Sequence, residues 1–132
     1  LAAMQSIIDR FIDETKSGEF RYGLGGGLGW NDIDPKRQEK YFKWRERITL
    51  DTRFIFQDSA RADLHKSKEK LLRNQVKVLP NHMKLSSDIT ITPRFMVIMK
   101  LTEPMSAIVI EDEEIINTHK ELFLFMWEML PE

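Results

Sequence analysis

Apolar side chains recur along this chain with two periods, one typical of helices and one typical of strands. Near the amino terminus, the helical spacing i, i+3, i+4, i+7, i+8 is met by Met4, Ile7, Ile8, Phe11 and Ile12. This predicts an amphipathic connector helix over residues 1–17, best defined from residue 3. Met4, Ile8 and Phe11 also match the a and d positions of a heptad. Two interpretations follow: packing on the helix's own domain, or the end of a longer coiled coil.

Short apolar runs predict the strands. Three of them, at residues 20–24, 52–56 and 76–79, alternate with helical segments at 35–47 and 60–74. The order β-α-β-α-β is typical of a parallel sheet with helical crossovers. Runs at 89–91, 95–101 and 106–110 follow with short turns, which favours an antiparallel, hairpin-like extension. The predicted fold is α/β, with one mixed sheet flanked by about four helices.

The last helix is predicted over residues 115–130, with Asp112 as its N-cap. One face carries Ile115, His119, Leu122, Met126 and Met129, and Ile116, Phe123, Trp127 and Leu130 lie beside it. Leu124 and Phe125 fall outside both sets, so the last turns are apolar almost all round. A helix of this kind is buried on more than one side. We therefore expect a homodimer, and the predicted interface residues are Met4, Ile8, Phe11, Leu124 and Phe125.

Composition narrows the class of protein. The chain has 132 residues, of which 42% are hydrophobic and 31% charged, with a formal net charge of −1. The length is enough for one globular domain, predicted over residues 18–132. A net charge this close to zero indicates no general affinity for nucleic acid or an anionic membrane. There is no cysteine, which excludes disulfides and thiolate metal sites and fits a cytoplasmic protein. We predict no membrane segment, no metal and no cofactor.

A glycine-rich loop follows the first strand. Residues 23–32 hold five of the six glycines of the chain. The loop matches neither G-x-G-x-x-G nor a P-loop, because the third glycine position is always occupied by another residue and no Gly-Lys pair exists. The loop is therefore interpreted as a connection or a place of close backbone packing, in preference to a nucleotide site. Trp30 is either a core residue or a stacking surface for a ligand.

The histidines do not form a catalytic motif. Phospholipase-D enzymes use H-x-K followed four residues later by aspartate, but His65 is followed by Lys-Ser-Lys without that aspartate. His65 and His82 are predicted to be exposed polar residues, and three histidines on three elements give no metal spacing. The chain is therefore predicted not to be an enzyme.

Several segments together resemble the C-terminal domain of TrmB-type transcription regulators. They are Tyr22 with its glycine loop, residues 54–59 (FIFQDS), residues 76–80 (VKVLP), residues 107–112 (AIVIED), and residues 121–123 and 127–128 in the last helix. The resemblance covers most of the chain from about Tyr22 onward. It implies a phospholipase-D-like α/β fold.

The resemblance also implies a function. It suggests an effector-sensing or dimerisation domain whose DNA-binding winged helix lies outside this chain, so that DNA would be bound only through that absent domain. Residues 1–17 would be the end of the connector between the two. Members of the family often sense sugars, so a sugar-like effector is expected. A ligand-free dimerisation module and, third, a degenerate phosphodiesterase are the alternatives.

A ligand site is expected above the carboxyl ends of the first strands, where open α/β sheets bind ligands. Aromatic surfaces and polar groups that would meet there are found at Tyr22, Trp30, Asn31, Asp32, Asp58 and Ser59. The aromatic residues would stack on the ligand, and the amide, carboxylates and hydroxyl would hydrogen-bond to it. The acidic residues are explained equally well as turn and cap residues.

Overall fold

The computed structural model describes residues 1–132, apart from the side chain of Asn31. Its helices are α1 (Ala2–Glu14), α2 (Trp30–Ile33), α3 (Pro35–Arg45), α4 (Ala60–Ser67), α5 (Glu69–Leu72) and α6 (Glu113–Met129). Its strands are β1 (Phe20–Gly25), β2 (Asp51–Phe56), β3 (Asn74–Val78), β4 (Asp88–Ile91), β5 (Met96–Lys100) and β6 (Ser106–Ile110). The prediction of an α/β fold is confirmed.

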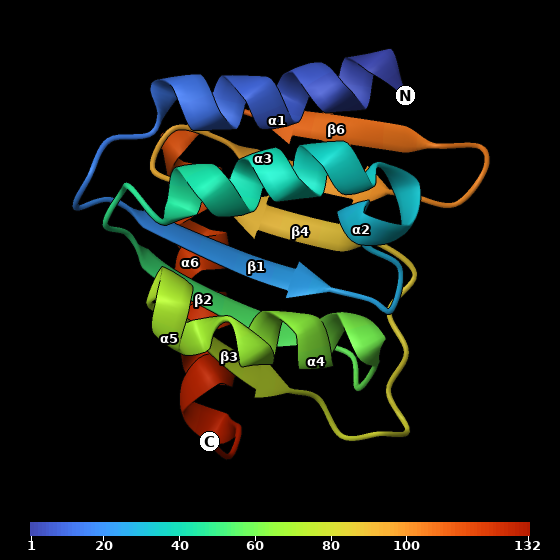
Figure 1. The fold of residues 1–132 in the computed structure, drawn as a ribbon. Helices are drawn as coiled ribbons and strands as arrows, with labels where there is room; N and C mark the ends of the chain where they lie inside the picture. The colour runs from blue at the N-terminus through green and yellow to red at the C-terminus, as the bar shows by residue number, and fades with distance from the viewer.

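The strands form one six-stranded sheet in the order β3-β2-β1-β4-β5-β6. β1 pairs with β2 and β2 with β3 in parallel, whereas β1–β4, β4–β5 and β5–β6 are antiparallel. The predicted parallel start and antiparallel extension are both present. Because β4 returns to the free side of β1, the two parts of the sheet meet at β1 (Figure 1).

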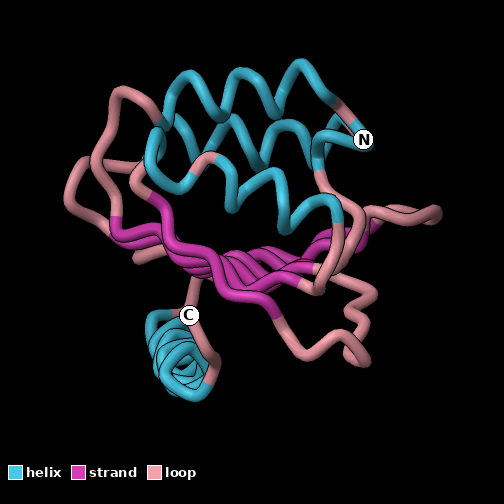
Figure 2. Tube along the Cα trace, turned by 60° about the horizontal axis from the view of Figure 1, so that its bottom comes forward, coloured by secondary structure: helices cyan, strands magenta, loops and turns pink.

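Helices cover the two faces of the sheet unequally. Figure 2 shows α6 alone on one face, with the other helices gathered on the opposite face. The core under α6 includes Tyr22, Ile55, Phe123 and Trp127. Two clusters lie on the other face, one under α1 against β5 and one under α4 against β2 and β3.

Helices α3 and α6 begin at the aspartates expected to cap them. The Asp112 carboxylate accepts hydrogen bonds from the backbone N–H groups of Glu114 and Ile115, both at 3.0 Å. Asp34 precedes Pro35 and accepts from the N–H of Arg37 at 3.3 Å. These side chains satisfy N–H groups that have no partner within the helix, and so they fix where each helix starts.

Three local features differ from the predictions. The helix expected over residues 60–74 is interrupted at Lys68, which separates α4 from α5, and Arg73 ends it with a left-handed φ of 58°. The short helix α2 was not predicted within the glycine-rich segment. The amino-terminal helix ends at Glu14, where Thr15 has extended backbone angles.

In the described part of the chain, no helix is both long and apolar enough to cross a lipid bilayer.

Candidate functional site

The glycine-rich loop is held by close backbone packing. The Gly26 N–H donates to the Asp88 carboxylate at 3.2 Å. A Cβ atom on Gly26 would collide with the backbone carbonyl oxygen of Leu85, whereas one on Gly27 would meet nothing closer than the Gln57 amide at 3.4 Å. The loop therefore needs glycine at Gly26 because the segment before β4 passes directly over it.

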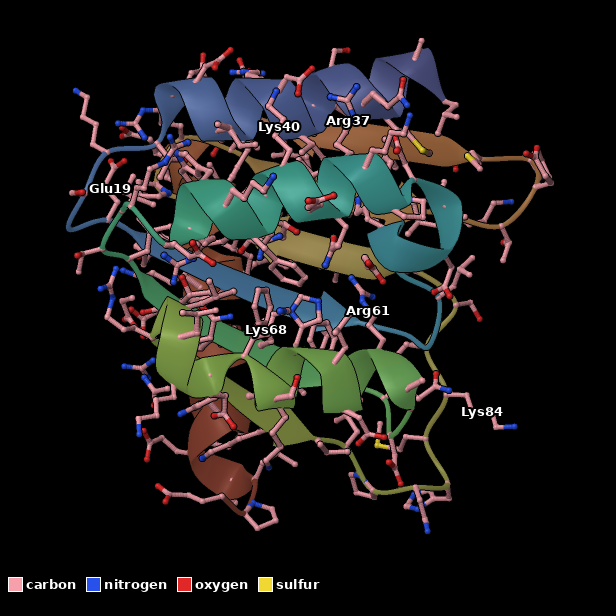
Figure 3. All side chains as sticks on the ribbon, viewed as in Figure 1. Glu19, Arg37, Lys40, Arg61, Lys68 and Lys84 are labelled. Atoms are coloured by element: carbon pink, nitrogen blue, oxygen red, sulfur yellow. The ribbon has the colours of Figure 1, made fainter. Side chains whose placement is uncertain are left out.

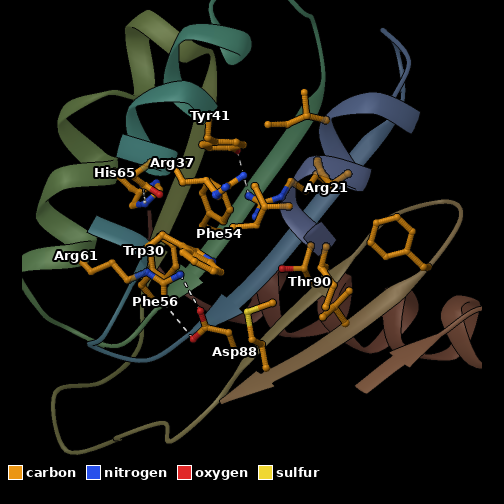
Figure 4. Close-up of a pocket in the computed structure, with 18 residues that line it drawn as sticks. Arg21, Trp30, Arg37, Tyr41, Phe54, Phe56, Arg61, His65, Asp88 and Thr90 are labelled. Carbon is orange, nitrogen blue, oxygen red and sulfur yellow. Dashed lines mark hydrogen bonds and ion pairs between the residues drawn. The ribbon is translucent and has the colours of Figure 1, made fainter. Parts of the chain in front are cut away.

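Arg61 in α4 joins this loop to the sheet. Its two terminal nitrogens lie 3.0 and 2.8 Å from the two carboxylate oxygens of Asp88, and both side chains are only 14% exposed. The same guanidinium donates to the carbonyl oxygens of Gly26 at 3.3 Å and Leu28 at 3.2 Å. Figure 4 shows this pairing at one side of the site. A bidentate, largely buried ion pair of this kind is geometrically specific. Removing one partner leaves the other charge buried and unpaired.

A cavity of about 80 Å³ lies between the sheet and helices α1, α3 and α4. Its aromatic walls are Phe11, Trp30, Tyr41, Phe54, Phe56 and Phe95. Its polar and charged side chains are Arg21, Arg37, Gln38, Arg61, His65, Asp88 and Thr90. Figure 4 shows most of these side chains converging from both layers. Concave surroundings that combine aliphatic and aromatic side chains with convergent polar groups are typical of small-molecule sites.

A second hollow of about 180 Å³ adjoins the cavity, towards the glycine-rich loop and the start of α4. The two hollows share Trp30, Gln38, Arg61 and His65, so these side chains form the wall between them. Figure 3 shows Arg61 between α4 and the helices above it. The second hollow lies at the carboxyl ends of β1 and β2, where a ligand was expected.

His65 is the most strongly perturbed group in this region. It is 5% exposed and is surrounded by the rings of Phe42, Phe54 and Phe56, with centroid distances of 5.0–5.6 Å. Burial, assisted by the positive charge of Arg61, lowers the pKa of His65 to about 3. The imidazole is therefore neutral near pH 7. The prediction that His65 is exposed is wrong, because α4 turns this residue towards the sheet.

Only part of the predicted ligand site comes together. Trp30 lines both hollows and Asp32 lines the second one. The Asp32 carboxylate accepts from the Gly29 N–H at 3.0 Å, which closes the first turn of α2. Asp58 is exposed and lines neither hollow; Ser59 caps α4 through its bond from Ala62. The side chain of Asn31 lies outside the described part of the chain.

Tyr22 lies on the other face of the sheet. Its ring stacks on Phe123 of α6 at 5.0 Å, and its hydroxyl donates to Asp51 at 2.8 Å. Burial, followed by the bond to Asp51, raises the pKa of Tyr22 to about 12. The structure therefore does not bring Tyr22 to Trp30 and Asp32, because Tyr22 packs under α6 whereas α2 lies on the opposite face of the sheet.

The predicted dimer residues fall into two groups. Met4 and Phe11 are buried within their own chain, in the cluster under α1, and Ile8 lines the cavity. Their heptad positions are thus occupied by intrachain packing. Leu124 packs partly on the core under α6, whereas Phe125 is 65% exposed.

Phe125 belongs to an exposed apolar strip on α6, which we call the α6 strip. Its members are Ile115, Leu122, Phe125, Met126 and Met129. Leu122 is 55% and Met129 70% exposed, while Ile116, Phe123 and Trp127 of the same helix are buried. Four members, Ile115, Leu122, Met126 and Met129, share one face with His119, and these five positions have the 4-3-4-3 spacing of a coiled-coil seam. Phe125 lies beside that face.

Sequence reasoning missed the cationic part of the site. Arg21 is the second residue of β1, between Phe20 and Tyr22. A charged residue in a strand that is covered by helices on both faces departs from the continuous apolar run expected there. This charged residue within the strand was the feature of the sequence that could have indicated a buried cation. Nothing in the local pattern placed Gln38 or His65 beside it.

Among the described residues, no group of three or more histidine, cysteine, aspartate or glutamate side chains could hold a metal ion. The hydrogen-bonding groups of the cavity are instead mainly nitrogen donors, which suit a ligand rich in acceptor atoms.

No protein-family profile matches the sequence. No curated protein matches it either. Among solved structures, the chain is similar to TrmBL2, described as an archaeal chromatin protein whose structure shows a novel mode of DNA binding. The TM-score is 0.61 at 12% sequence identity, and the alignment covers 96% of this chain and 49% of TrmBL2. The chain thus spans about half the length of TrmBL2 and shares with that half its fold.

Proposed function

We propose that this chain is the C-terminal regulatory domain of a cytoplasmic, TrmB-type transcription regulator whose DNA-binding winged helix lies outside it. The observation that carries the proposal is the structural similarity to TrmBL2, in which the alignment covers 96% of this chain but only 49% of TrmBL2. The half of TrmBL2 that is not aligned could hold a separate DNA-binding domain. The phospholipase-D-like character of the fold belongs to the same proposal.

The first role of the domain is to sense an effector. The cavity and the adjoining hollow support this role, because both are lined by side chains from several elements. Ile7, Ile8, Phe11 and Ile12 of α1 form one wall of the cavity. Since α1 is the proposed end of the connector, a ligand that fits one position of α1 better than another would shift the connector. A coupling of about 1–3 kcal/mol is typical of such switches.

The second role is dimerisation. The α6 strip supports it, because a seam of Leu122, Met126 and Met129 on one helix is self-complementary and would be covered by the same seam of a second copy. A domain that dimerises through α6 without any ligand is the alternative proposal, and the exposed Phe125 favours it equally.

We propose no catalytic activity. Asp88, the carboxylate of the cavity, is already paired with Arg61, and His65 is buried beside Gln38 with no nucleophile in hydrogen-bond contact among the described residues. A degenerate phosphodiesterase would need an activated nucleophile at this site.

Sedimentation equilibrium of the chain tests the proposal, first alone and then with a panel of sugars and nucleotides. A dimer whose association constant changes at least about tenfold with one compound would support a ligand-responsive sensor. A dimer indifferent to all of them would support the ligand-free module. A monomer under every condition would remove both roles.

A further inference from the structure

Arg21 projects from the start of β1 into the layer between the sheet and helices α1 and α3. Its guanidinium carbon lies 5.0, 5.1 and 4.8 Å from the ring centroids of Phe11, Tyr41 and Phe54. One terminal nitrogen donates to the Tyr41 hydroxyl at 3.1 Å. The Nε atom is buried and has no hydrogen-bond partner among the described residues. Aromatic faces attract the cation, but they leave this N–H group without an acceptor.

The charges around the cavity do not balance. Three guanidinium groups line it. Arg61 is paired with Asp88, and Arg37 is held by Asp9 at 2.5 Å and by Asp34 at 3.5 Å. Within the described part of the chain, no carboxylate lies within 4.0 Å of Arg21. The cavity therefore carries one positive charge that the protein itself does not neutralise.

His65 supplies a second donor without a partner. Its Nε2 atom lies 3.3 Å from the side-chain nitrogen of Gln38. With the Gln38 amide in this orientation, Nε2 accepts the hydrogen bond, so the neutral imidazole carries its proton on Nδ1. Nδ1 is buried and has no partner among the described residues. The rings of His65 and Phe54 are 5.1 Å apart, so His65 and Arg21 flank the same phenyl ring.

The rest of the cavity is apolar. Ile7 and Ile8 of α1 face it from one side, and Val97 and Met99 of β5 face it from the other. A volume of about 80 Å³ corresponds to about five water-sized positions. An apolar cavity of about 150 Å³ holds benzene, so a space of about half that volume fits a ligand of about three to six non-hydrogen atoms.

We propose that this cavity binds a small monocarboxylic acid with an apolar body. Its carboxylate pairs with the Arg21 guanidinium and accepts from Nε, and His65 Nδ1–H is a further donor beside Phe54. The apolar body packs between α1 and β5. A single negative charge matches the single unbalanced positive charge, and an apolar body suits the apolar side chains that α1 and β5 contribute to the cavity.

This proposal rests on the proposed sensing function in one respect: the bound acid would be the effector that the domain senses. α1 closes the cavity on one side and is joined to α3 by polar contacts from Gln5 to Asp34 at 2.7 Å and from Asp9 to Lys40 at 3.2 Å. A ligand that fills the space beneath α1 therefore stabilises α1 in its docked position.

Calorimetric titration of the chain at pH 7 with three matched pairs tests the proposal. The pairs are acetate and acetamide, propanoate and propanamide, and 2-methylpropanoate and 2-methylpropanamide, all small enough for the cavity. At least one acid is expected to bind at least about tenfold more tightly than its neutral amide, because a charge-assisted hydrogen bond is lost with the carboxylate. Equal affinity within every pair, or no saturable binding of any acid, would overturn the proposal.

Substitution of the cation locates the site. Arg21→Gln is expected to abolish the preference for the acid over its amide, whereas Arg47→Gln, which removes one charge from an exposed position, should preserve it. Should Arg21→Gln fail to fold, the nuclear magnetic resonance spectrum of the unsubstituted chain decides. Titration with the acid must then shift the Arg21 Nε–H signal and the His65 ring signals; shifts confined to other residues would overturn the assignment.

The result separates this proposal from the sensing function. An acid that binds through Arg21 but leaves sedimentation unchanged would keep the cavity assignment and remove the sensing role. A chain whose association responds to a sugar or nucleotide but which ignores all three acids would remove the cavity assignment and keep the sensing role.

Discussion

The Lys77 ammonium caps the end of α6 and at the same time lies on the face of Trp127. It donates to the Trp127 carbonyl oxygen at 2.7 Å and to that of Leu130 at 3.0 Å, and it lies 4.6 Å from the centroid of the Trp127 ring. Lys77 belongs to β3 and is only 8% exposed. A positive charge at the carboxyl end of a helix interacts favourably with the helix dipole. This one residue thus fixes the end of the only helix seen on its face of the sheet (Figure 2).

Lys77→Met should destabilise the chain by about 1.5–3 kcal/mol, since two hydrogen bonds from a charged donor are lost while the apolar stem is largely kept. The free energy of unfolding in urea measures the loss. Lys84→Met is the matched control, because Lys84 is exposed in the loop after β3 and projects away from the fold (Figure 3). Equal stability of both variants would mean that the cap contributes nothing.

The buried imidazole makes stability depend on pH. The pKa of His65 is about 3 in the folded chain and near its ordinary value of 6.5 in the unfolded chain. Between these values the unfolded state binds more protons, so the free energy of unfolding falls as the pH is lowered. Between pH 6.5 and 5 the expected loss is about 2 kcal/mol, at most about 1.4 kcal/mol per pH unit.

Urea unfolding at pH 5 and pH 6.5 tests this pH dependence. His65→Gln should remove most of the dependence, whereas His82→Gln, at an exposed position, should leave it in place. Asp9, Glu19 and Asp34, whose carboxyl pKa values are lowered by hydrogen bonds and nearby cations, add their own loss only at lower pH. If the pH dependence of the free energy of unfolding persists in His65→Gln, another titratable group must cause it.

The order and type of most elements could be predicted because binary patterning and capping residues act locally. The apolar run at residues 106–110 and the cap at Asp112 specify β6 and the start of α6 without reference to the rest of the chain. The interruption at Lys68 is different. It lets Leu72 reach full burial and lets Glu69 accept from the Val76 N–H at 3.2 Å, and both effects depend on where β3 lies.

The candidate site was predicted only in part, because its members meet through tertiary packing. Trp30 and Asp32 could be expected near the ends of the strands, since chain order determines where parallel strands end. Arg21 and His65 come from the start of a strand and from a helix, and they flank the same ring only when α4 packs on β2 and β3. Tyr22 was misplaced for a related reason: its face of the sheet depends on which helix covers it.

The glycine-rich loop offers a sharp comparison between neighbouring positions. Gly26→Ala should cost about 1–3 kcal/mol, because the added methyl group collides with the Leu85 carbonyl oxygen, a backbone atom and not the end of a flexible side chain. Gly27→Ala should change stability by less than about 0.5 kcal/mol, since its nearest neighbour is a side chain at ordinary contact distance. Thermal or urea unfolding of the two variants measures the difference. Similar losses at both positions would mean that the loop needs flexibility and not close approach.

A single substitution in the α6 strip tests the proposed dimerisation. Leu122 lies at the centre of the strip and is 55% exposed, so Leu122→Glu should leave the free energy of unfolding of the monomer within about 0.5 kcal/mol of its original value. If the strip pairs with a second copy, the same change places a charge in an apolar seam. The dissociation constant of the dimer should then rise at least about tenfold.

Asn117→Glu is the matched control for this change. Asn117 is an exposed position of the same helix that lies outside the α6 strip, and the substitution adds the same charge. Sedimentation equilibrium of the three chains separates the effect of position from the effect of charge. If both variants dissociate equally, net repulsion and not the seam controls association, because the two charges differ only in the face of α6 that carries them. If Leu122→Glu alone dissociates, the exposed apolar side chains of α6 are the contact between two copies.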